Sequence, residues 1–489
     1  MESWLEPLYD AEGSRAIDAW AIEEQGISST QLGEAAGTVL AEAVASLSPP
    51  GPVRILCGKG NNGGDGKVAA GHLRRLGFVV EAVDLWSDEV PDDLDAWLAG
   101  SGAVVDAIFG TGFSGSPRAP AIAAIEAINR CGAAVVACDI ASGVDASSGE
   151  IAGAAVEADL TVSFHVAKLG QRIAPGKWHT GELRVVAIGI PPGAPVESAA
   201  GTIEPAVLAL APRRGPRSTK FNSGQVAIAG GSRGLTGAMR MSSLAAIRAG
   251  AGYATVAVPA DLETVFEAGE PEVMSVGCPG GDGCLTPASA KAILRTFERA
   301  AAGVLGPGLG RDPGSVELAR EVVGAIEAPL VIDADGLNAF AGHLGPIAAR
   351  EAPSVLTPHA GELGRLLGRD SEQIAAHRLA SAREAARAAG AVVVLKGDDT
   401  IVSDGKRVAV NAISAPALAT AGSGDVLSGI LAALLARGLE PFAAACAAVL
   451  AHACAGRDAA TRIGAAESVI AGDVIGSIPV GLRSGEPVE

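Results

Sequence analysis

A short turn in the last fifth of the chain combines glycines with a carboxylate. Gly422, Ser423 and Gly424 precede Asp425, and an apolar helix is expected to begin near Val426. Glycines let backbone N–H groups face a ligand, and a helix N-terminus carries about half a positive charge, so this turn can bind an anion such as phosphate. Asp425 would repel phosphate, so we expect it to accept a proton from a hydroxyl that attacks a phosphoryl group. The alternative is that Asp425 only caps the helix.

Polar residues also follow three expected strands in the same half of the chain. They are Asp333 and Asp335, His359 and Glu362, and Lys396 and Thr400. Taken singly, such residues usually cap helices or lie in solvent. The carboxyl ends of parallel strands, however, border the ligand crevice of an open sheet. Together with the glycine-rich loop at residues 306–310, these residues predict one site.

A second glycine-rich loop follows the first expected strand. Gly58, Gly60 and Gly63 have the spacing G-x-G-x-x-G, which lets backbone N–H groups approach a pyrophosphate. The loop also contains Asp65, whose charge would repel that ligand unless a cation lies between them. A dehydrogenase is disfavoured, because Asp84 at the distance of a ribose contact is its only further support.

The elements that must position these residues alternate between β-type and Ala-rich helical stretches, which predicts parallel sheets. In the first part, strands are expected at residues 53–56, 79–85, 103–108, 133–139, 160–164 and 183–188, with helices such as 66–76 and 121–129. In the second part, they are expected at residues 225–229, 254–259, 303–305, 330–333, 354–356 and 392–395. The Pro-rich stretch 189–223 predicts a surface linker, and hence domains at residues 1–212 and 217–489.

Composition narrows the class of protein. The chain has 489 residues, a formal net charge of −18 and 48% hydrophobic residues, which favours a compact α/β protein and disfavours nucleic acid and anionic membranes as partners. Its seven cysteines are odd in number and contain no C-x-x-C pair, which predicts free thiols. The acidic start is unlike a signal peptide, and the apolar helical segments 426–436 and 442–455 are too short to span a bilayer. We therefore expect the protein to stay in the cytoplasm.

The motifs together resemble a known pair of enzyme domains. The stretches 422–425, 396–400, 333–336, 357–362, 230–238 and 306–310 are similar to the NAD(P)H-hydrate dehydratase branch of the ribokinase-like fold. The stretches 61–65, 106–112 and 139–143 resemble the NAD(P)H-hydrate epimerase domain. Their order is that of the fused bacterial repair enzymes, which implies an N-terminal Rossmann-like three-layer domain and a C-terminal ribokinase-like α/β domain. The chain departs from the family pattern at Lys67 and Ala141, among other positions.

For the first domain, the resemblance implies epimerisation of the R and S hydrates of NADH and NADPH. A potassium ion is expected near Asn62, Asp106 and Ser142, which would balance the acidic loop. Asp139 is expected to contact the hydrated nicotinamide ring and is the candidate for proton transfer at C6. The expected substrate-binding residues are Asn61, Asn62, Gly63, Gly64, Asp65, Gly110, Thr111, Gly112, Phe113, Ser114, Gly115, Ser116 and Asp139.

For the second domain, the resemblance implies dehydration of the S hydrate at the expense of ADP, giving AMP and phosphate. Asp425 would deprotonate the C6 hydroxyl, and Ala238, Gly308, His359 and Asp425 would face the hydrate. The nucleotide, with Mg²⁺, would be bound by Lys396, Gly397, Asp398, Asp399, Thr400, Gly422, Ser423 and Gly424. A homo-oligomer is also expected.

Two rival functions remain open from the sequence. A ribokinase-like vitamin or sugar kinase would use the same Gly-Ser-Gly-Asp turn at residues 422–425. Alternatively, the first domain could serve only as a binding scaffold. Product phosphorylation with ATP would identify the kinase, and the rate at which the isolated first domain equilibrates the two hydrates would test the scaffold.

Overall fold

The computed structural model describes residues 2–87 and 90–483. The chain forms two compact units: the first comprises Pro7–Gly201, and the second comprises Glu2–Glu6 together with the chain from Thr202 onward. Each unit contains its own sheet and its own hydrophobic core. This division confirms the predicted α/β protein with two sheets.

The first unit contains a parallel sheet of six strands, which lie in the order β3-β2-β4-β5-β6-β7. Their bounds are Val53–Cys57 for β2, Val80–Asp84 for β3, Ala103–Ala107 for β4, Ala134–Cys138 for β5, Leu160–Phe164 for β6 and Glu182–Val186 for β7. All six strands were predicted to within two residues at each end. Strand β3 lies on one side of β2, and the next strand in the chain, β4, lies on its other side. The strand order therefore reverses at β2, and such a switch point is where open α/β sheets bind ligands.

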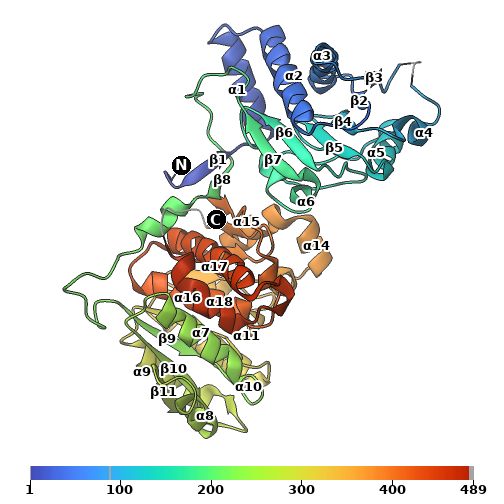
Figure 1. Ribbon diagram of the computed structural model, residues 1–489. Coiled ribbons are helices and arrows are strands. Elements are labelled where there is room, and N and C mark those ends of the chain that lie inside the picture. Colours follow the sequence, from blue (N-terminus) through green and yellow to red (C-terminus); the bar gives the residue numbers. More distant parts are fainter. Residues whose placement is uncertain (1, 88–89, 484–489) are drawn as a thin grey trace. The chain divides into compact units, whose positions relative to one another are not determined.

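Helices cover both faces of this sheet (Figure 1). One core cluster joins the strands to α1, Ala11–Glu23, α2, Ser29–Ser46, and α3, Asn61–Arg75. The other joins them to α4, Leu94–Leu98, and α5, Ala121–Arg130, while α6 spans Gly176–Thr180. The expected helix at residues 66–76 in fact begins at Asn61. The prediction left these residues out because glycine has a low helix propensity. The structure nevertheless needs a glycine at position 63, because a Cβ there would lie 1.9 Å from the Gly58 carbonyl oxygen.

The second unit is built on a sheet of eleven strands in the order β1-β8-β19-β18-β17-β16-β15-β14-β9-β10-β11. The run from β11 to β17 is parallel, whereas β17, β18 and β19 pair antiparallel. The predicted strands are β9, Gln225–Ala229, β10, Tyr253–Pro259, β14, Ala302–Leu305, β15, Leu330–Ile332, β16, Ser354–Leu356, and β17, Val392–Leu395. The strands without a prediction are β1, Leu5–Leu8, β8, Ala200–Ile203, β11, Val273–Cys278, β18, Ile401–Ser403, and β19, Val408–Val410. A separate small ribbon pairs β12, Gly280–Gly281, with β13, Cys284–Leu285.

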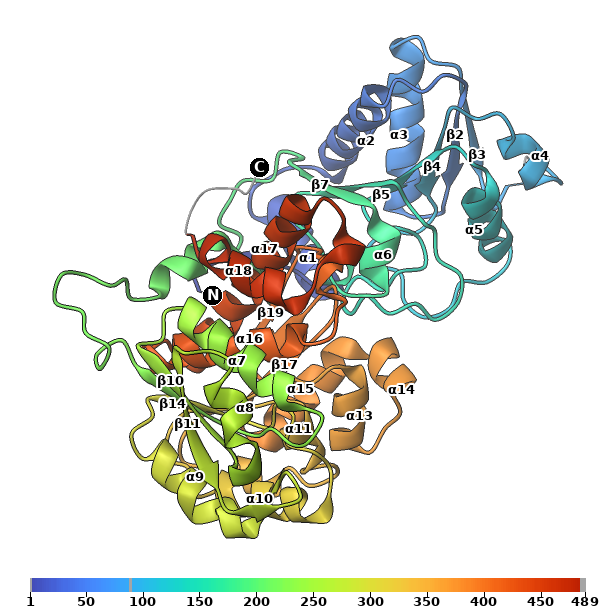
Figure 2. The same ribbon diagram turned by 60° about the horizontal axis from the view of Figure 1, so that its bottom comes forward.

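Four helices lie together on one face of this sheet: α7, Thr236–Arg248, α16, Ser423–Ala436, α17, Pro441–Ile463, and α18, Ala471–Gly481 (Figure 1). Three others lie side by side in Figure 2: α13, Ala360–Leu367, α14, Ser371–Ala376, and α15, Arg378–Ala389. The remaining helices are α8, Glu263–Glu267, α9, Ala290–Phe297, α10, Pro313–Val323, α11, Asp335–Asn338, and α12, Gly345–Ala348. Among the described residues, no helix is long and apolar enough to cross a membrane.

The boundary of the second unit differs from the predicted linker. Residues 189–223 contain β8 and a 3₁₀-helix at Pro205–Leu210, whose Val207 and Leu208 belong to the core of the second unit. The N-terminal residues of the chain join the same core, because Trp4 is 5% exposed and packs against Phe442 at a ring distance of 6.1 Å. These segments are too short to show a hydrophobic period, so sequence pattern does not detect them. The seven cysteines are all free, as predicted.

Candidate active sites

The carboxyl ends of the first unit's strands carry the predicted polar residues. Asn61, Asn62, Gly63, Gly64 and Asp65 form the first turns of α3, directly after β2. The loop after β4 contains Gly110, Thr111, Gly112, Phe113, Ser114, Gly115 and Ser116, and Phe113 stacks on Phe109 at 4.5 Å. A Cβ at Gly110 would lie 3.2 Å from Asn62, so the two loops lie against each other. The structure therefore brings both predicted binding loops together.

Asp106 and Ser142 form a buried pair of oxygen ligands. The Asp106 carboxylate, which is 0% exposed, accepts hydrogen bonds from the Ser142 hydroxyl at 2.6 Å and from the Ser142 backbone N–H at 2.8 Å. Burial raises the pKa of Asp106 to about 6, against the effect of these hydrogen bonds. Asn62 is also buried, and its amide nitrogen has no hydrogen-bond partner among the described residues. Carboxylate, hydroxyl and amide oxygens are the donors that hard cations prefer, so this set fits the predicted potassium ion.

Asp139 lies at the end of β5 with a backbone φ of +66°, a conformation that few non-glycine residues adopt. Its carboxylate accepts hydrogen bonds from the ammonium of Lys168, the hydroxyl of Thr111 and the backbone N–H of Phe164. Lys168 is 2% exposed. Although burial raises the pKa of Asp139, the Lys168 ammonium and the hydrogen bonds hold it below its ordinary value. Asp139 is therefore ionised and fully hydrogen-bonded, which makes it a weak proton acceptor on its own.

Lys168 was not predicted from the sequence. It follows β6 by four residues, so it is another polar residue beyond a strand end, the same signal that marked sites in the second half. Its Nζ also donates to the Ser163 hydroxyl at 3.0 Å and to the Phe164 carbonyl at 3.2 Å. The chain thus places a buried ammonium at the position where the nicotinamide ring was expected.

Burial offers a further explanation of the acidic α3 loop, beside the cation that the sequence suggested. Burial raises the pKa of Asp65 to about 8, and the charges of Asp139 and Asp18 raise it further. Asp18 lies on α1, and burial raises its pKa to about 6. Asp65 is therefore largely protonated at neutral pH and can donate a hydrogen bond rather than repel a pyrophosphate.

In the second unit, the predicted turn forms the N-terminus of α16. Gly422 is the N-cap with φ +89°, and a Cβ there would lie 2.4 Å from the Met241 sulfur, so the position requires glycine. Asp425 lies in the first turn but is not the N-cap residue, and its carboxylate has no hydrogen bond among the described residues. Burial raises the pKa of Asp425 to about 7, and Asp333 adds to this effect. The capping alternative therefore finds no support in the hydrogen bonds.

A cation lies beside this turn. A Cβ on Gly424 would be 3.3 Å from the ammonium of Lys396, which follows β17. Lys396 pairs with Asp333 at 3.2 Å and with Glu362 at 3.6 Å. Although burial lowers the pKa of Lys396, these two carboxylates raise it above its ordinary value. The helix end and the ammonium together form an anion site.

His359, at the N-cap of α13, connects to the same cluster. Its Nδ1 accepts a hydrogen bond from the Gly361 backbone N–H at 3.0 Å, and its Nε2 lies 3.5 Å from Glu362. Burial lowers the pKa of His359, so the ring is neutral at pH 7. Gly308 and Ala238 also lie together, since a Cβ on Gly308 would be 3.3 Å from that of Ala238. The residues predicted to face the hydrate thus all belong to the second unit. Gly308 follows β14 and His359 follows β16, whereas Ala238 lies in α7 and Asp425 in α16.

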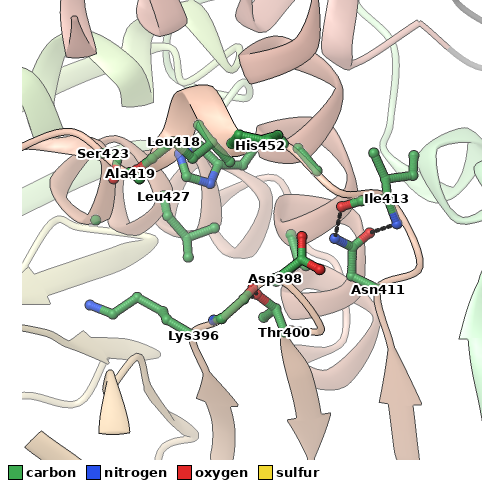
Figure 3. Close-up of a pocket in the computed structure, with 16 residues that line it drawn as sticks. Lys396, Asp398, Thr400, Asn411, Ile413, Leu418, Ala419, Ser423, Leu427 and His452 are labelled. Carbon is green, nitrogen blue, oxygen red and sulfur yellow. Dashed lines mark hydrogen bonds between the residues drawn. The ribbon is translucent and has the colours of Figure 1, made fainter. Parts of the chain in front are cut away.

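A cavity of about 300 Å³ adjoins the anion site (Figure 3). Its polar wall contains Lys396, Gly397, Asp398, Thr400, Ser423 and Gly424, six of the residues predicted to bind nucleotide. Its apolar wall contains Leu418, Leu427 and Val449, with His452 from α17. Sequence reasoning missed His452, whose only signal is an imidazole within an apolar helix. Burial lowers the pKa of His452 to about 4, so the ring is neutral.

Two predicted nucleotide-binding residues, Asp399 and Gly422, do not line this cavity, and Asp399 forms a buried ion pair instead. Its carboxylate is 1% exposed and pairs with Arg378 at 2.7 Å, and the residue does not line the cavity. Arg378 also donates to the Lys396 carbonyl at 3.3 Å. Asp399 thus stabilises the loop at residues 396–400 through its ion pair with the buried Arg378 guanidinium.

Comparison with known proteins shows the family to which both halves of the chain are similar. A family model described as NAD(P)H-hydrate dehydratase matches residues 226–479, and one described as YjeF-related protein N-terminus matches residues 29–100 and 84–170. The bifunctional NAD(P)H-hydrate repair enzyme Nnr of Salinibacter ruber is 36% identical, over 98% of this chain and 96% of its own length. The enzyme of the same name from Moorella thermoacetica is also 36% identical, over 96% of this chain and 95% of its own.

Solved structures resemble the second unit. The ADP/ATP-dependent NAD(P)H-hydrate dehydratase of Bacillus subtilis, co-crystallised with ATP and Mg²⁺, matches with a TM-score of 0.50 and 27% identity, over 58% of this chain and 98% of that one. A ribokinase-like superfamily protein of Enterococcus faecalis matches with a TM-score of 0.50 and 28% identity, over 57% of this chain and 94% of that one. The predicted ribokinase-like fold of the second half is confirmed.

Proposed function

The chain belongs to the bifunctional NAD(P)H-hydrate repair enzymes, with an epimerase and a dehydratase in one polypeptide, and we propose how its residues divide the work. The first unit epimerises the R and S hydrates of NADH and NADPH. The second unit dehydrates the S hydrate at the expense of ADP. The observation that carries the second assignment is the Asp425 carboxylate, which is free of hydrogen bonds among the described residues and lies beside the anion site of α16 and Lys396.

In the proposed dehydration, Asp425 accepts the proton of the C6 hydroxyl, and the resulting alkoxide attacks the β-phosphoryl group of ADP. A phosphorus–oxygen bond forms to the substrate and the bond to AMP breaks. The C6–O bond then breaks with the electron pair leaving on phosphate, and water takes the C5 proton, which restores the dihydronicotinamide. A pKa of about 7 suits Asp425 to this role, because the base is available at neutral pH and still binds a proton well.

The cavity beside Lys396 is the proposed nucleotide site. Lys396, Gly424 and the α16 N-terminus would bind phosphate, and the apolar wall with Leu427 and Val449 would cover the base. We propose that Mg²⁺ arrives with the nucleotide and neutralises its phosphates. In the part of the chain that the structure describes, no group of three or more His, Cys, Asp and Glu side chains could hold a metal ion, so the phosphates are the proposed main ligands.

For epimerisation, we propose that the Lys168 ammonium donates a proton to the C6 hydroxyl, which leaves as water while the ring nitrogen supplies the electron pair. Water then adds to the opposite face of C6 and returns a proton to Lys168, which gives the other epimer. Asp139 orients the ammonium and stabilises its charge. The protonated Asp65 and the loop at residues 110–116 hold the rest of the substrate. Asn62, Asp106 and Ser142 would bind potassium, which supplies a positive charge at the pyrophosphate.

One assay tests the two activities together. Purified R and S hydrates are incubated with the enzyme and ADP, and the absorbance of the reduced nicotinamide is followed. The S hydrate is expected to react at once and the R hydrate only after epimerisation. Phosphorylation of a vitamin or sugar with ATP, without any return of absorbance from either hydrate, would favour the kinase. Cytoplasmic location and a homo-oligomeric state stay predictions.

A further inference from the structure

The order of the strands sets the direction in which a dinucleotide lies on the first unit. Given the proposed epimerase function, on which this inference rests, the nicotinamide lies beyond β5 at Asp139 and the pyrophosphate lies beyond β2 at the α3 N-terminus. Because the sheet order is β3-β2-β4-β5, the adenosine half must continue past β2 toward β3. In dinucleotide-binding sheets, the residues at the end of that neighbouring strand contact the ribose next to adenine.

The end of β3 is occupied by Asp84, which is in register with Cys57 at the end of β2. Its carboxylate accepts a hydrogen bond from the ammonium of Lys67 at 2.9 Å and from the Trp86 backbone N–H at 3.1 Å. Lys67 comes from α3, two residues after Asp65, and its side chain is 55% exposed. The hydrogen bond from Lys67 lowers the pKa of Asp84, so the pair is ionised.

A second lysine lies at the same edge. The ammonium of Lys59, in the loop after β2, lies 5.5 Å from the ring centre of Trp86. Trp86 in turn contacts Phe109 at 6.0 Å, at the start of the loop that precedes Thr111. Among the described residues, the cluster of Lys59, Lys67, Asp84 and Trp86 therefore combines two ammonium groups with one carboxylate, and it adjoins both substrate loops.

These charges favour one of the two possible substrates. An acidic residue at this position ordinarily accepts the ribose hydroxyls and repels a 2′-phosphate, whereas a basic residue accommodates the phosphate. Here Lys67 already neutralises Asp84, and Lys59 remains as a further cation. We infer that the cluster of Lys59, Lys67, Asp84 and Trp86 is the adenosine-ribose subsite of the epimerase unit and binds the 2′-phosphate of NADPH hydrate in preference to NADH hydrate.

The kinetic test compares both R hydrates with the full chain. The wild type is expected to epimerise R-NADPH hydrate with a kcat/KM about 10-fold above that for R-NADH hydrate, the size of one hydrogen bond between charged groups. Lys67→Met is expected to remove most of that preference, because kcat/KM should fall further for R-NADPH hydrate than for R-NADH hydrate. Asp84→Asn, which removes the negative charge, is expected to raise the preference. Arg75→Met is the matched control, because it removes one positive charge from the far end of α3, and it is expected to leave the ratio unchanged.

Hydrogen exchange gives a second readout that needs no turnover. NADP⁺ is expected to protect residues 58–67 and 80–87 more than NAD⁺ at the same concentration, and Lys67→Met is expected to abolish that difference. Equal protection by the two nucleotides, or an equal loss of kcat/KM for both hydrates in Lys67→Met, would overturn the inference. If NADP⁺ protects these segments selectively but neither R hydrate reacts faster than it does without enzyme, the subsite stands and the epimerase assignment fails.

Discussion

The ammonium of Lys168 and the carboxylate of Asp139 form an ion pair in the interior of the first unit, although 29 positions separate them in the chain. Lys168 is 2% exposed, so the pair is shielded from water and from salt. A buried charge of this kind is stable only with its partner, and removal of one partner leaves the other uncompensated. The same ion pair therefore contributes to the stability of the first unit and supplies the proton in the proposed epimerisation.

Lys168→Met tests this coupling. Epimerisation is expected to fall by about 10²- to 10⁴-fold, the contribution of a positioned acid, because methionine fills the space but carries no proton. The pKa of Asp139 is expected to rise, since its main counter-charge is lost. The rate from the R hydrate measures the first effect, and dehydration of the S hydrate in the same preparation serves as the control. Normal epimerisation in the folded variant would remove Lys168 from the mechanism.

Asp425→Asn is expected to abolish dehydration while epimerisation and ADP binding stay nearly intact. Asparagine keeps the shape but cannot accept the proton, so the loss should be about 10²- to 10⁴-fold, or roughly 3 to 5 kcal/mol of barrier. Single-turnover dehydration, ADP affinity and the thermal midpoint are measured on one preparation. Asp312→Asn is the matched control, because Asp312 caps α10 through a bond to the Ser315 N–H at 3.1 Å. If both variants only lose about 1 kcal/mol of stability and turn over normally, Asp425 is a structural residue.

The pH dependence of dehydration should report the Asp425 carboxyl. Its pKa is about 7, and the base acts only when ionised, so kcat/KM is expected to rise tenfold per pH unit below about pH 7 and to level off above it. His359 should not produce this limb, because burial lowers the pKa of its ring. His359→Asn should therefore keep the inflection even if it lowers the rate. A flat profile from pH 5.5 to 8 would contradict the assignment.

Potassium should strengthen substrate binding to the first unit. Burial holds the pKa of Asp106 at about 6, and a bound cation would favour its ionised form. Replacing potassium by tetramethylammonium is expected to weaken binding of the hydrate and to lower the thermal midpoint of the first unit. Asp106→Asn should make both quantities insensitive to this exchange. Unchanged affinity and an unchanged midpoint in the wild type would argue against a cation at this position.

Trp4→Ala tests whether the N-terminal residues belong to the dehydratase unit. Trp4 is 5% exposed, packs against Phe442, and accepts a hydrogen bond from the Glu204 backbone N–H at 3.1 Å. Loss of a buried tryptophan typically costs about 3 to 5 kcal/mol, so dehydratase activity should be lost at a lower temperature while epimerase activity is retained. A fragment that starts at residue 200 should likewise be more stable than one that starts at residue 217, which lacks β8 and the 3₁₀-helix at Pro205–Leu210. Equal melting of the two fragments would show that these segments contribute little.

The sequence alone determined the longer buried strands and the motifs, whereas β1, β8, β11, β18 and β19 had no prediction. Apolar runs between turn residues placed the strands to within a few residues, because hydrophobic periodicity is a local property. The turn at residues 422–425 and the loop at residues 61–65 were found for the same reason, since the glycines, amides and carboxylates that define their chemistry are adjacent in the chain. The resemblance of these motifs to known enzymes implied an epimerase half and a dehydratase half, whereas the boundary at residue 201 came from the structure.

The tertiary structure alone decided the state of the ionisable groups and the direction of the side chains. Burial together with Asp139 and Asp18 makes Asp65 neutral, and Arg378 turns Asp399 away from the cavity. Lys168 reaches Asp139 only because β5 and β6 are neighbours in the sheet. Each of these facts depends on groups from distant segments of the chain, and a pKa or a hydrogen bond is set by what surrounds a side chain in space, which spacing along the sequence does not encode.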